Sequence, residues 1–118
     1  MLIPSPRVQE KTLARLKEYA RRKRYVGKKG VTEIRGWFKG NHLFLEVVKE
    51  AKGGFVGKLF NMGSVKGIGK VARLEYMGPN KWKFLIYRSD TKKYGPYREF
   101  SEGTIEQCLD VVAKAFLS

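Results

Sequence analysis

The sequence has few of the residues from which disulfides, metal sites and catalytic centres are built. Its 118 residues include one cysteine, Cys108, and one histidine, His42. A single cysteine cannot form a disulfide within the chain, and together with one histidine it provides too few ligands for a structural zinc site. We therefore expect no bound metal and no cofactor.

Long hydrophobic runs are also missing, because charged residues interrupt the apolar stretches after a few positions. A membrane-spanning helix needs about 20 consecutive, mostly apolar residues. The first six residues lack the positive charge and the long apolar core of a signal peptide. The sequence therefore predicts a soluble, cytoplasmic protein with no membrane partner.

Acidic residues are scarce as well. There are 11 Asp and Glu against 25 Lys and Arg, which gives a net charge of +14 with the histidine neutral. Residues 1–30 and 31–98 carry net charges of +8 and +9, whereas residues 99–118 carry −3. At 42% hydrophobic residues the chain can form one core. We expect a single domain, 1–118, with a basic face and with the acidic C-terminal segment turned away from that face.

An amphipathic helix is predicted near the N-terminus. Ser5 is a suitable N-cap, and Pro6 suits the first helical position, where its missing N–H would have no partner in any case. Apolar or small residues then recur every three or four positions, at Val8, Thr12, Leu13, Leu16, Tyr19 and Ala20. Gly27 and Gly30 end this unit.

Residues 31–100 change to an alternation of period two, which predicts a mainly antiparallel sheet of about five strands. Two β-hairpins are expected, each with a turn that contains glycine and asparagine, from residues 31–38 with 42–49 and from residues 70–77 with 81–88. A fifth strand, 93–100, contains Pro96, which has no backbone N–H and so shortens the strand or places it at an edge.

Residues 51–69 fit neither period. They contain six glycines together with several large apolar side chains. We expect a flexible, glycine-rich loop, and a loop this long in a small domain often has a function.

A second helix is predicted at the C-terminus. Thr104 and Gln107 have the spacing of a capping box, and an apolar face follows at Ile105, Cys108, Leu109, Val112 and Phe116. The predicted fold class is therefore α+β, with an N-terminal helix, a mainly antiparallel sheet and a C-terminal helix packed on the sheet.

The densest basic cluster follows the first helix. Its members could neutralise the phosphates of a nucleic-acid backbone, and they are Arg21, Arg22, Lys23, Arg24, Lys28 and Lys29. Cations at a helix C-terminus also interact favourably with the helix dipole, but the dipole accounts for one or two charges rather than six. A helix lying on a membrane surface is a third interpretation, and the narrow apolar stripe, which the core requires, makes it weaker.

Basic and aromatic residues alternate along the predicted strands. Trp82 shares a strand face with Phe84 and Ile86 and is predicted to lie in the core, whereas Trp37 shares its face with Arg35 and is a candidate for stacking on a base. The alternative for Trp37 is a half-buried ring covered by arginine stems. The strand and turn residues that would extend the basic cluster are Arg35, Trp37, Lys81, Lys83, Arg88, Lys92, Lys93, Tyr94 and Arg98.

Signals for nucleotide binding or catalysis are weak. Residues 67–72 spell G-x-G-x-x-A but lead into a strand, whereas the dinucleotide fingerprint requires a following helix. His42 more often caps a turn or is partly buried than acts as a general base. No two carboxylates are brought together by their spacing. The sequence therefore favours a protein without catalytic residues.

Four segments resemble an uncharacterised bacterial domain family. They are IRG at 34–36, LFLE at 43–46, VARLEY at 71–76 and KWKFLIYR at 81–88, in an order that the family shares. The resemblance covers most of the chain and implies a helix followed by strands, with no activity attached.

The last third of the chain, from residue 81 through the C-terminal helix, looks like a second family. It is similar to the small DNA-binding domain of phage integrases and plant ethylene-response factors, in which three strands lie in the major groove. This resemblance implies that five basic residues would face DNA: Lys81, Lys83, Arg88, Lys92 and Arg98.

The leading functional prediction is non-catalytic binding of DNA or RNA, mainly through phosphates. An alternative is a protein-binding module, of the kind found in phage or mobile-element factors, that docks on an acidic protein partner. A third is a small toxin-type ribonuclease, for which His42 and Glu46 are the residues to test.

Overall fold

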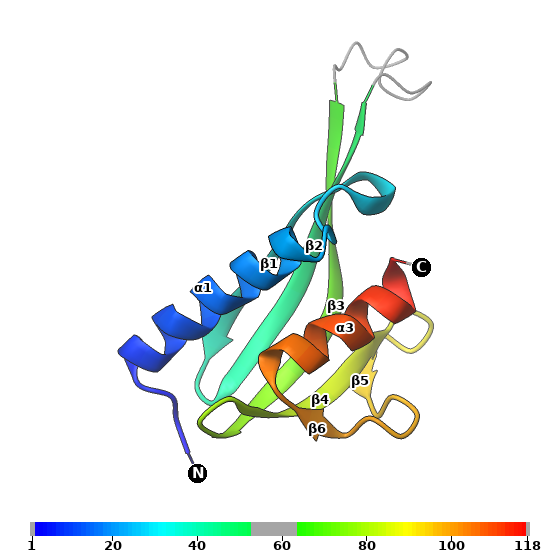
Figure 1. Cartoon of the computed structure of the whole chain (residues 1–118). Coiled ribbons are helices and arrows are strands. Elements are labelled where there is room, and N and C mark those ends of the chain that lie inside the picture. Colours follow the sequence, from blue (N-terminus) through cyan, green and yellow to red (C-terminus); the bar gives the residue numbers. More distant parts are fainter. Residues whose placement is uncertain (1, 53–63, 118) are drawn as a thin grey trace.

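The computed structural model describes residues 2–52 and 64–117. Its elements are, in chain order, helix α1 (Pro6–Arg22), a 3-10 turn (Lys28–Gly30), strands β1 (Val31–Lys39), β2 (His42–Lys52), β3 (Ser64–Gly78), β4 (Lys81–Arg88), β5 (Lys93–Gly95) and β6 (Glu102–Gly103), and helix α3 (Ile105–Phe116). Figure 1 shows the two helices lying against one sheet. The predicted α+β class is confirmed.

The predicted start of α1 is confirmed in detail. The Ser5 hydroxyl accepts a hydrogen bond from the backbone N–H of Val8 (3.3 Å), and Pro6 occupies the first helical position. The helix buries Leu16 and Ala20 against the sheet and exposes its basic side chains. Beyond its end the chain reverses at Gly27, whose φ of 103° is unstrained only for glycine.

The sheet is antiparallel throughout, in the order β1-β2-β3-β4-β5, and β6 also pairs with β4. Both predicted hairpins, β1 with β2 and β3 with β4, are present. β2 and β3 also pair with each other, from His42 opposite Glu75 to Lys52 opposite Ser64, and this pairing was not predicted. Residues 64–69 pair with residues 47–52 as strands, so the expectation of a loop over all of 51–69 is wrong at both ends. Residues 53–63 lie outside the described part of the chain.

Pro96 shortens the last predicted strand, as its missing N–H suggested. β5 ends at Gly95, and only an isolated bridge between Tyr97 and Phe100 continues the pairing expected over 93–100. The chain then makes the short strand β6 and enters α3.

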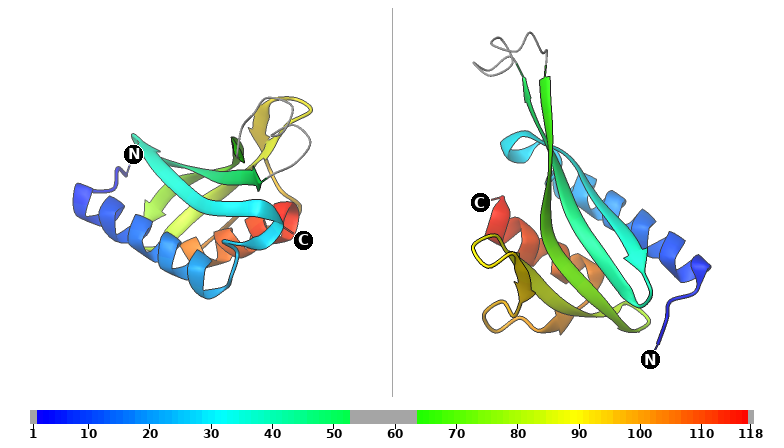
Figure 2. Two further views of the ribbon diagram at one scale, coloured as in Figure 1. Left: turned by 90° about the horizontal axis from the view of Figure 1, so that it is seen from above. Right: turned by 180° about the vertical axis from the view of Figure 1, so that it is seen from behind.

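Both helices cover the same face of the sheet, and no helix of the described residues lies over the opposite face (Figure 2). The core lies between the helices and the covered face, and Trp82 and Phe84 are each 1% exposed there. The prediction that Trp82 belongs to the core is confirmed. A sheet with one covered face has a second face on which side chains are free for other roles.

The N-terminus of α3 forms the predicted capping box. The Thr104 hydroxyl accepts a hydrogen bond from the Gln107 N–H (3.1 Å), and the Gln107 side chain accepts one from the Thr104 N–H (2.9 Å). α3 is turned away from the uncovered face of the sheet, but its acidic residues face α1. The Asp110 carboxylate accepts hydrogen bonds from the hydroxyls of Tyr19 (3.0 Å) and Tyr25 (2.6 Å).

Neither described helix has the length and apolar character that crossing a membrane requires.

Candidate nucleic-acid interface

The uncovered face of the sheet is built by the residues that alternate with the core. Directly opposed residues on neighbouring antiparallel strands share a face. Trp37 on β1 opposes Phe44 on β2, Phe44 opposes Arg73 on β3, and Arg73 opposes Leu85 on β4. One row of side chains therefore crosses four strands on the side of the sheet away from the helices.

Four aromatic rings on this face, Trp37, Phe44, Tyr94 and Tyr87, form a continuous chain of contacts, which we call the aromatic row. Trp37 and Phe44 are stacked, with ring centroids 4.3 Å apart and planes 12° from parallel. Phe44 meets Tyr94 edge-on at 6.0 Å, and Tyr94 meets Tyr87 at 5.2 Å. The rings come from β1, β2, β5 and β4, so the row exists only when the sheet is assembled.

Trp37 is the most accessible member of the aromatic row. It is 43% exposed, whereas the other three rings are half-buried. β1 is the first strand of the sheet, and Phe44 covers the side of the indole that faces the sheet interior. The other side of the indole faces the free edge.

Two cations lie against the row. The Arg73 guanidinium is 5.2 Å from the centre of the Tyr94 ring, and the Lys70 ammonium is 5.7 Å from that of Tyr87. Both distances are within the range of cation–π attraction. The Nε atom of Arg73 is buried and has no hydrogen-bond partner among the described residues. Positive charge and aromatic surface are thus interleaved on this face.

Acidic side chains neutralise part of the positive charge on the uncovered face of the sheet. Glu46 accepts a hydrogen bond from Arg35 Nε (3.1 Å), and the Glu46 side chain is only 13% exposed. Glu75 lies 3.6 Å from His42 Nε2. Burial and the nearby Glu46 carboxylate raise the pKa of the Tyr94 phenol above its ordinary value. The Tyr94 phenol therefore keeps its proton to a higher pH than an exposed tyrosine does.

The structure brings five of the residues predicted for a nucleic-acid site onto this face. Arg35, Trp37 and Tyr94 belong to the cluster just described. Lys81 and Lys83 alternate with buried Trp82 and so lie on the same side of β4. The Lys81 ammonium is 3.5 Å from Glu102 on β6.

The basic cluster lies in the last turn of α1 and just beyond it, on the helix layer and away from the aromatic row. The side chains of Arg21, Arg22, Lys23, Arg24 and Lys28 are exposed. Arg21 pairs with Glu18 at 2.7 Å, and Arg22 lies over the Tyr19 ring at 5.3 Å. The side chain of Lys29 lies outside the described part of the chain. This cluster and the predicted residues of the uncovered face therefore lie on different surfaces and do not form one continuous patch.

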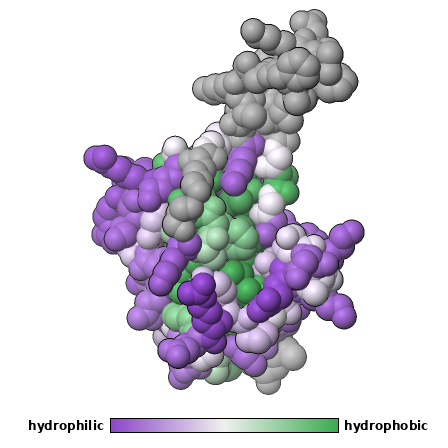
Figure 3. Space-filling model, turned by 90° about the vertical axis from the view of Figure 1, so that its right-hand side faces the viewer, coloured by the Kyte–Doolittle hydropathy of each residue, from purple (hydrophilic) through white to green (hydrophobic). Residues whose placement is uncertain are grey.

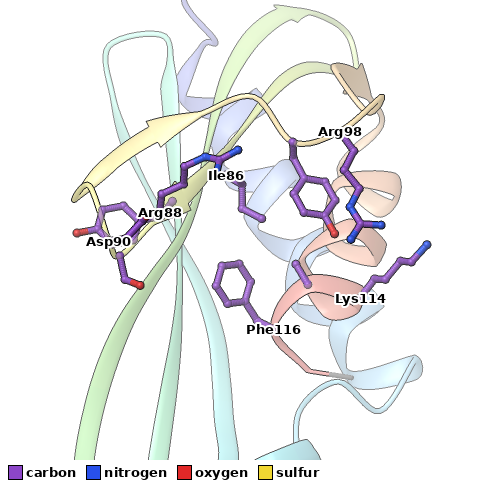
Figure 4. A pocket seen from close by; sticks show the side chains of 10 residues that line it. Ile86, Arg88, Asp90, Arg98, Lys114 and Phe116 are labelled. Carbon is purple, nitrogen blue, oxygen red and sulfur yellow. The ribbon is translucent and has the colours of Figure 1, made fainter.

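Arg88 and Arg98 belong to a third place, a shallow hollow of about 520 Å³ between the end of β4 and the end of α3. Figure 4 shows Arg98 beside Lys114 on one wall and Arg88 and Asp90 toward the other, above an apolar floor that includes Ile86 and Phe116. Arg88 donates a hydrogen bond to the Pro96 carbonyl (3.2 Å), which fixes its direction. Lys92 and Lys93 are exposed in the nearby turn and on β5.

Four residues of the face were not named by the prediction: Phe44, Lys70, Arg73 and Tyr87. A signal for Phe44 was present in the sequence, because it alternates along β2 with Leu43, Leu45 and Val47, which are buried in the core. The bulge opposite Leu45 and Glu46 buries Val71 and leaves Lys70 on the uncovered face, and the pattern of one strand does not reveal a bulge.

The two residues considered for catalysis, His42 and Glu46, do not lie together in one site. His42 and Glu46 are four positions apart on β2, about 13 Å along an extended strand. Each contacts a different neighbour, Glu75 and Arg35 respectively. Within residues 2–52 and 64–117, no three His, Cys, Asp or Glu side chains cluster as they would to hold a metal ion.

Comparison with protein-family models, with curated proteins and with solved structures returns no match to this chain.

Proposed function

We propose that this protein binds nucleic acid without catalysis, through the uncovered face of its sheet. The observation that carries the proposal is the aromatic row interleaved with Arg73 and Lys70 on a face that no helix covers. Aromatic rings stack on bases, and neighbouring cations neutralise phosphates. A face built only to be solvated has no need of four contacting rings.

The net charge of +14 supports the same proposal. Each phosphate that the protein neutralises releases counterions, so the logarithm of the affinity falls linearly with the logarithm of salt concentration, by about 0.9 per phosphate on duplex DNA. Lys81 and Lys83 on the same face, together with the exposed side chains of Lys92 and Lys93, would add further phosphate contacts. The affinity is therefore expected to depend steeply on salt.

The test is fluorescence anisotropy with labelled DNA and RNA oligonucleotides at several salt concentrations. Arg73→Gln with Lys70→Gln is expected to weaken binding and to reduce the salt slope by about one unit for each phosphate that the variant no longer neutralises. Lys11→Gln with Lys17→Gln removes the same charge from exposed positions on α1 and is the matched control. An affinity that does not change with salt, or an equal effect of both double variants, contradicts the proposal.

A second candidate function, docking on an acidic protein partner, is favoured by a different surface. Figure 3 shows apolar surface between hydrophilic margins along one side of the molecule. A hollow of about 380 Å³ is lined by Ile68, which is 56% exposed, together with Phe116 and the side chains of Lys49 and Lys70. An apolar strip with a basic rim fits an amphipathic acidic segment. Capture of a partner that survives nuclease treatment and is abolished by Ile68→Asp would support this candidate.

A further inference from the structure

We propose that the uncovered face selects single-stranded over double-stranded nucleic acid, with an unpaired base stacked on the outer side of Trp37. This inference rests on the proposed function and names the form of the nucleic acid. It follows from the geometry of the indole and its neighbours.

Neighbouring rings hold the indole of Trp37 in one orientation, so its exposed side can serve as a platform for stacking. Phe44 stacks on one side of the indole with the planes 12° from parallel, and Phe44 is in turn supported by the edge of Tyr94. The ring is therefore fixed in orientation, although it is 43% exposed. A fixed exposed ring loses little conformational freedom when another ring stacks on it.

The side of the indole opposite Phe44 lies toward the edge of the sheet, because β1 is the edge strand and β2 lies on its other side. A flat aromatic ligand that enters from the edge would extend the stack of Trp37 and Phe44 by one ring. Nucleobases are flat and present a π-face whatever their sequence, so the platform has no sequence requirement.

A base within a duplex cannot stack on Trp37 unless it first leaves the double helix. Its bases are already stacked and paired, and extracting one costs a few kcal/mol. The free-energy cost of presenting a base is much smaller in a single strand, because the base is already unpaired. It can continue along the row toward Arg73 and Lys70, where cations lie beside the rings of Tyr94 and Tyr87. The four strands from β1 to β4 span about 14 Å, so the face accommodates a short stretch of strand.

The two tryptophans make the inference directly measurable, because Trp82 is 1% exposed and Trp37 is 43% exposed. A ligand in solution therefore changes mainly the fluorescence of Trp37. We would titrate the full chain with ten-nucleotide oligo(dT) and oligo(rU) and with a ten-base-pair duplex. The expected result is strong quenching and tighter binding with the single strands.

Substitutions then locate the effect. Trp37→Ala and Trp37→Leu are expected to weaken single-strand binding by about 5- to 160-fold, the range expected when one base–aromatic stack is removed. Trp37→Phe keeps a stacking ring and is expected to retain most of the affinity without the quenching. Val26→Ala removes another exposed apolar side chain, distant in the fold, and should change nothing. Circular dichroism confirms that each variant is folded.

The outcomes separate the inference from the proposed function. Equal affinity for duplex and single strand, with no effect of Trp37→Leu, overturns the inference and leaves phosphate-mediated binding standing. No binding of either form at low salt overturns both. A difference between oligo(dT) and oligo(rU) identifies which single strand the face prefers and supports the inference.

Discussion

The ring of Phe44 on β2 stacks against the indole of Trp37 on β1. The two ring centroids are 4.3 Å apart, and the ring planes are nearly parallel. Neither ring is covered by a helix, so the pair stabilises the hairpin of β1 and β2 from its open side. Paired aromatic rings contribute about 0.5–1.5 kcal/mol beyond the area that they bury.

Phe44→Ala is expected to lower the free energy of unfolding by about 1–3 kcal/mol, because it removes this ring pair and part of the half-buried surface. Trp37 should also become more mobile, which lowers its fluorescence anisotropy. Phe44→Leu keeps apolar volume without a ring, so it should cost less stability and still release Trp37. Urea denaturation and steady-state anisotropy measure the two effects, and an unchanged anisotropy in both variants would contradict the supporting role of Phe44.

Gly36 allows α1 to approach the sheet. A Cβ at this position would lie 2.8 Å from Leu43 Cδ1 and 3.3 Å from Leu13 Cδ2 of the helix. Gly36→Ala is therefore expected to destabilise the fold by about 1–3 kcal/mol, the usual cost of overpacking a core. Gly67→Ala is the control, because nothing lies within 4 Å of its Cβ, and it should stay within about 0.5 kcal/mol of the parent in urea denaturation. Equal destabilisation in the two variants would argue against this packing role.

The buried thiol of Cys108 is expected to make the free energy of unfolding fall as pH rises in the alkaline range. The side chain is fully buried on α3, and burial raises the pKa of its thiol from 9.0 to about 12. Between these values the folded chain retains a proton that the unfolded chain releases, so stability falls as pH rises from 9 toward 12, by up to about 1.4 kcal/mol per unit. Below pH 9 the thiol contributes nothing to the pH dependence.

The contribution of Cys108 is isolated by comparison with Cys108→Ala. Tyr25 adds to the alkaline destabilisation in both proteins, because its burial and its hydrogen bond to Asp110 raise the pKa of its phenol. The free energy of unfolding of each protein is measured from pH 8 to pH 10.5. The difference between the slopes of the parent and of Cys108→Ala gives the contribution of the thiol. Reaction of Cys108 with a thiol reagent should likewise be limited by opening of the fold, and fast reaction at pH 8.5 would refute the inaccessible thiol.

Glu46 limits the positive charge of the uncovered face through its bond to Arg35. Glu46→Gln is expected to tighten nucleic-acid binding at low salt and to steepen the salt slope by up to about one unit, because the guanidinium becomes free to contact a phosphate. The stability change should be about 1 kcal/mol or less, since Arg35 is 41% exposed. Glu10→Gln removes an exposed carboxylate from α1 and controls for net charge. Anisotropy titrations in which both variants gain affinity equally would assign the effect to net charge alone.

Local sequence patterns determined much of this protein. The Ser5–Pro6 start of α1, the Thr104 capping box and the burial of Trp82 follow from contacts within a few residues or from alternation along one strand, and each agrees with the structure. The class of the fold follows from the same patterns, because helix and strand periods differ. The basic excess is likewise a property of composition.

The tertiary structure alone decided how the strands register and which face of the sheet the helices cover. Phe44 and Tyr94 are 50 positions apart, on the second and the last strand of the β1-to-β5 order, and their rings meet only in the folded sheet. The pairing of residues 64–69 with β2, in a segment expected to be a loop, also depends on the partner strand. Alternation shows which side chains share a face, but only the packing of the whole sheet fixes which faces become one surface. The candidate site is for this reason assembled from residues on five strands, and no strand carries a recognisable motif by itself.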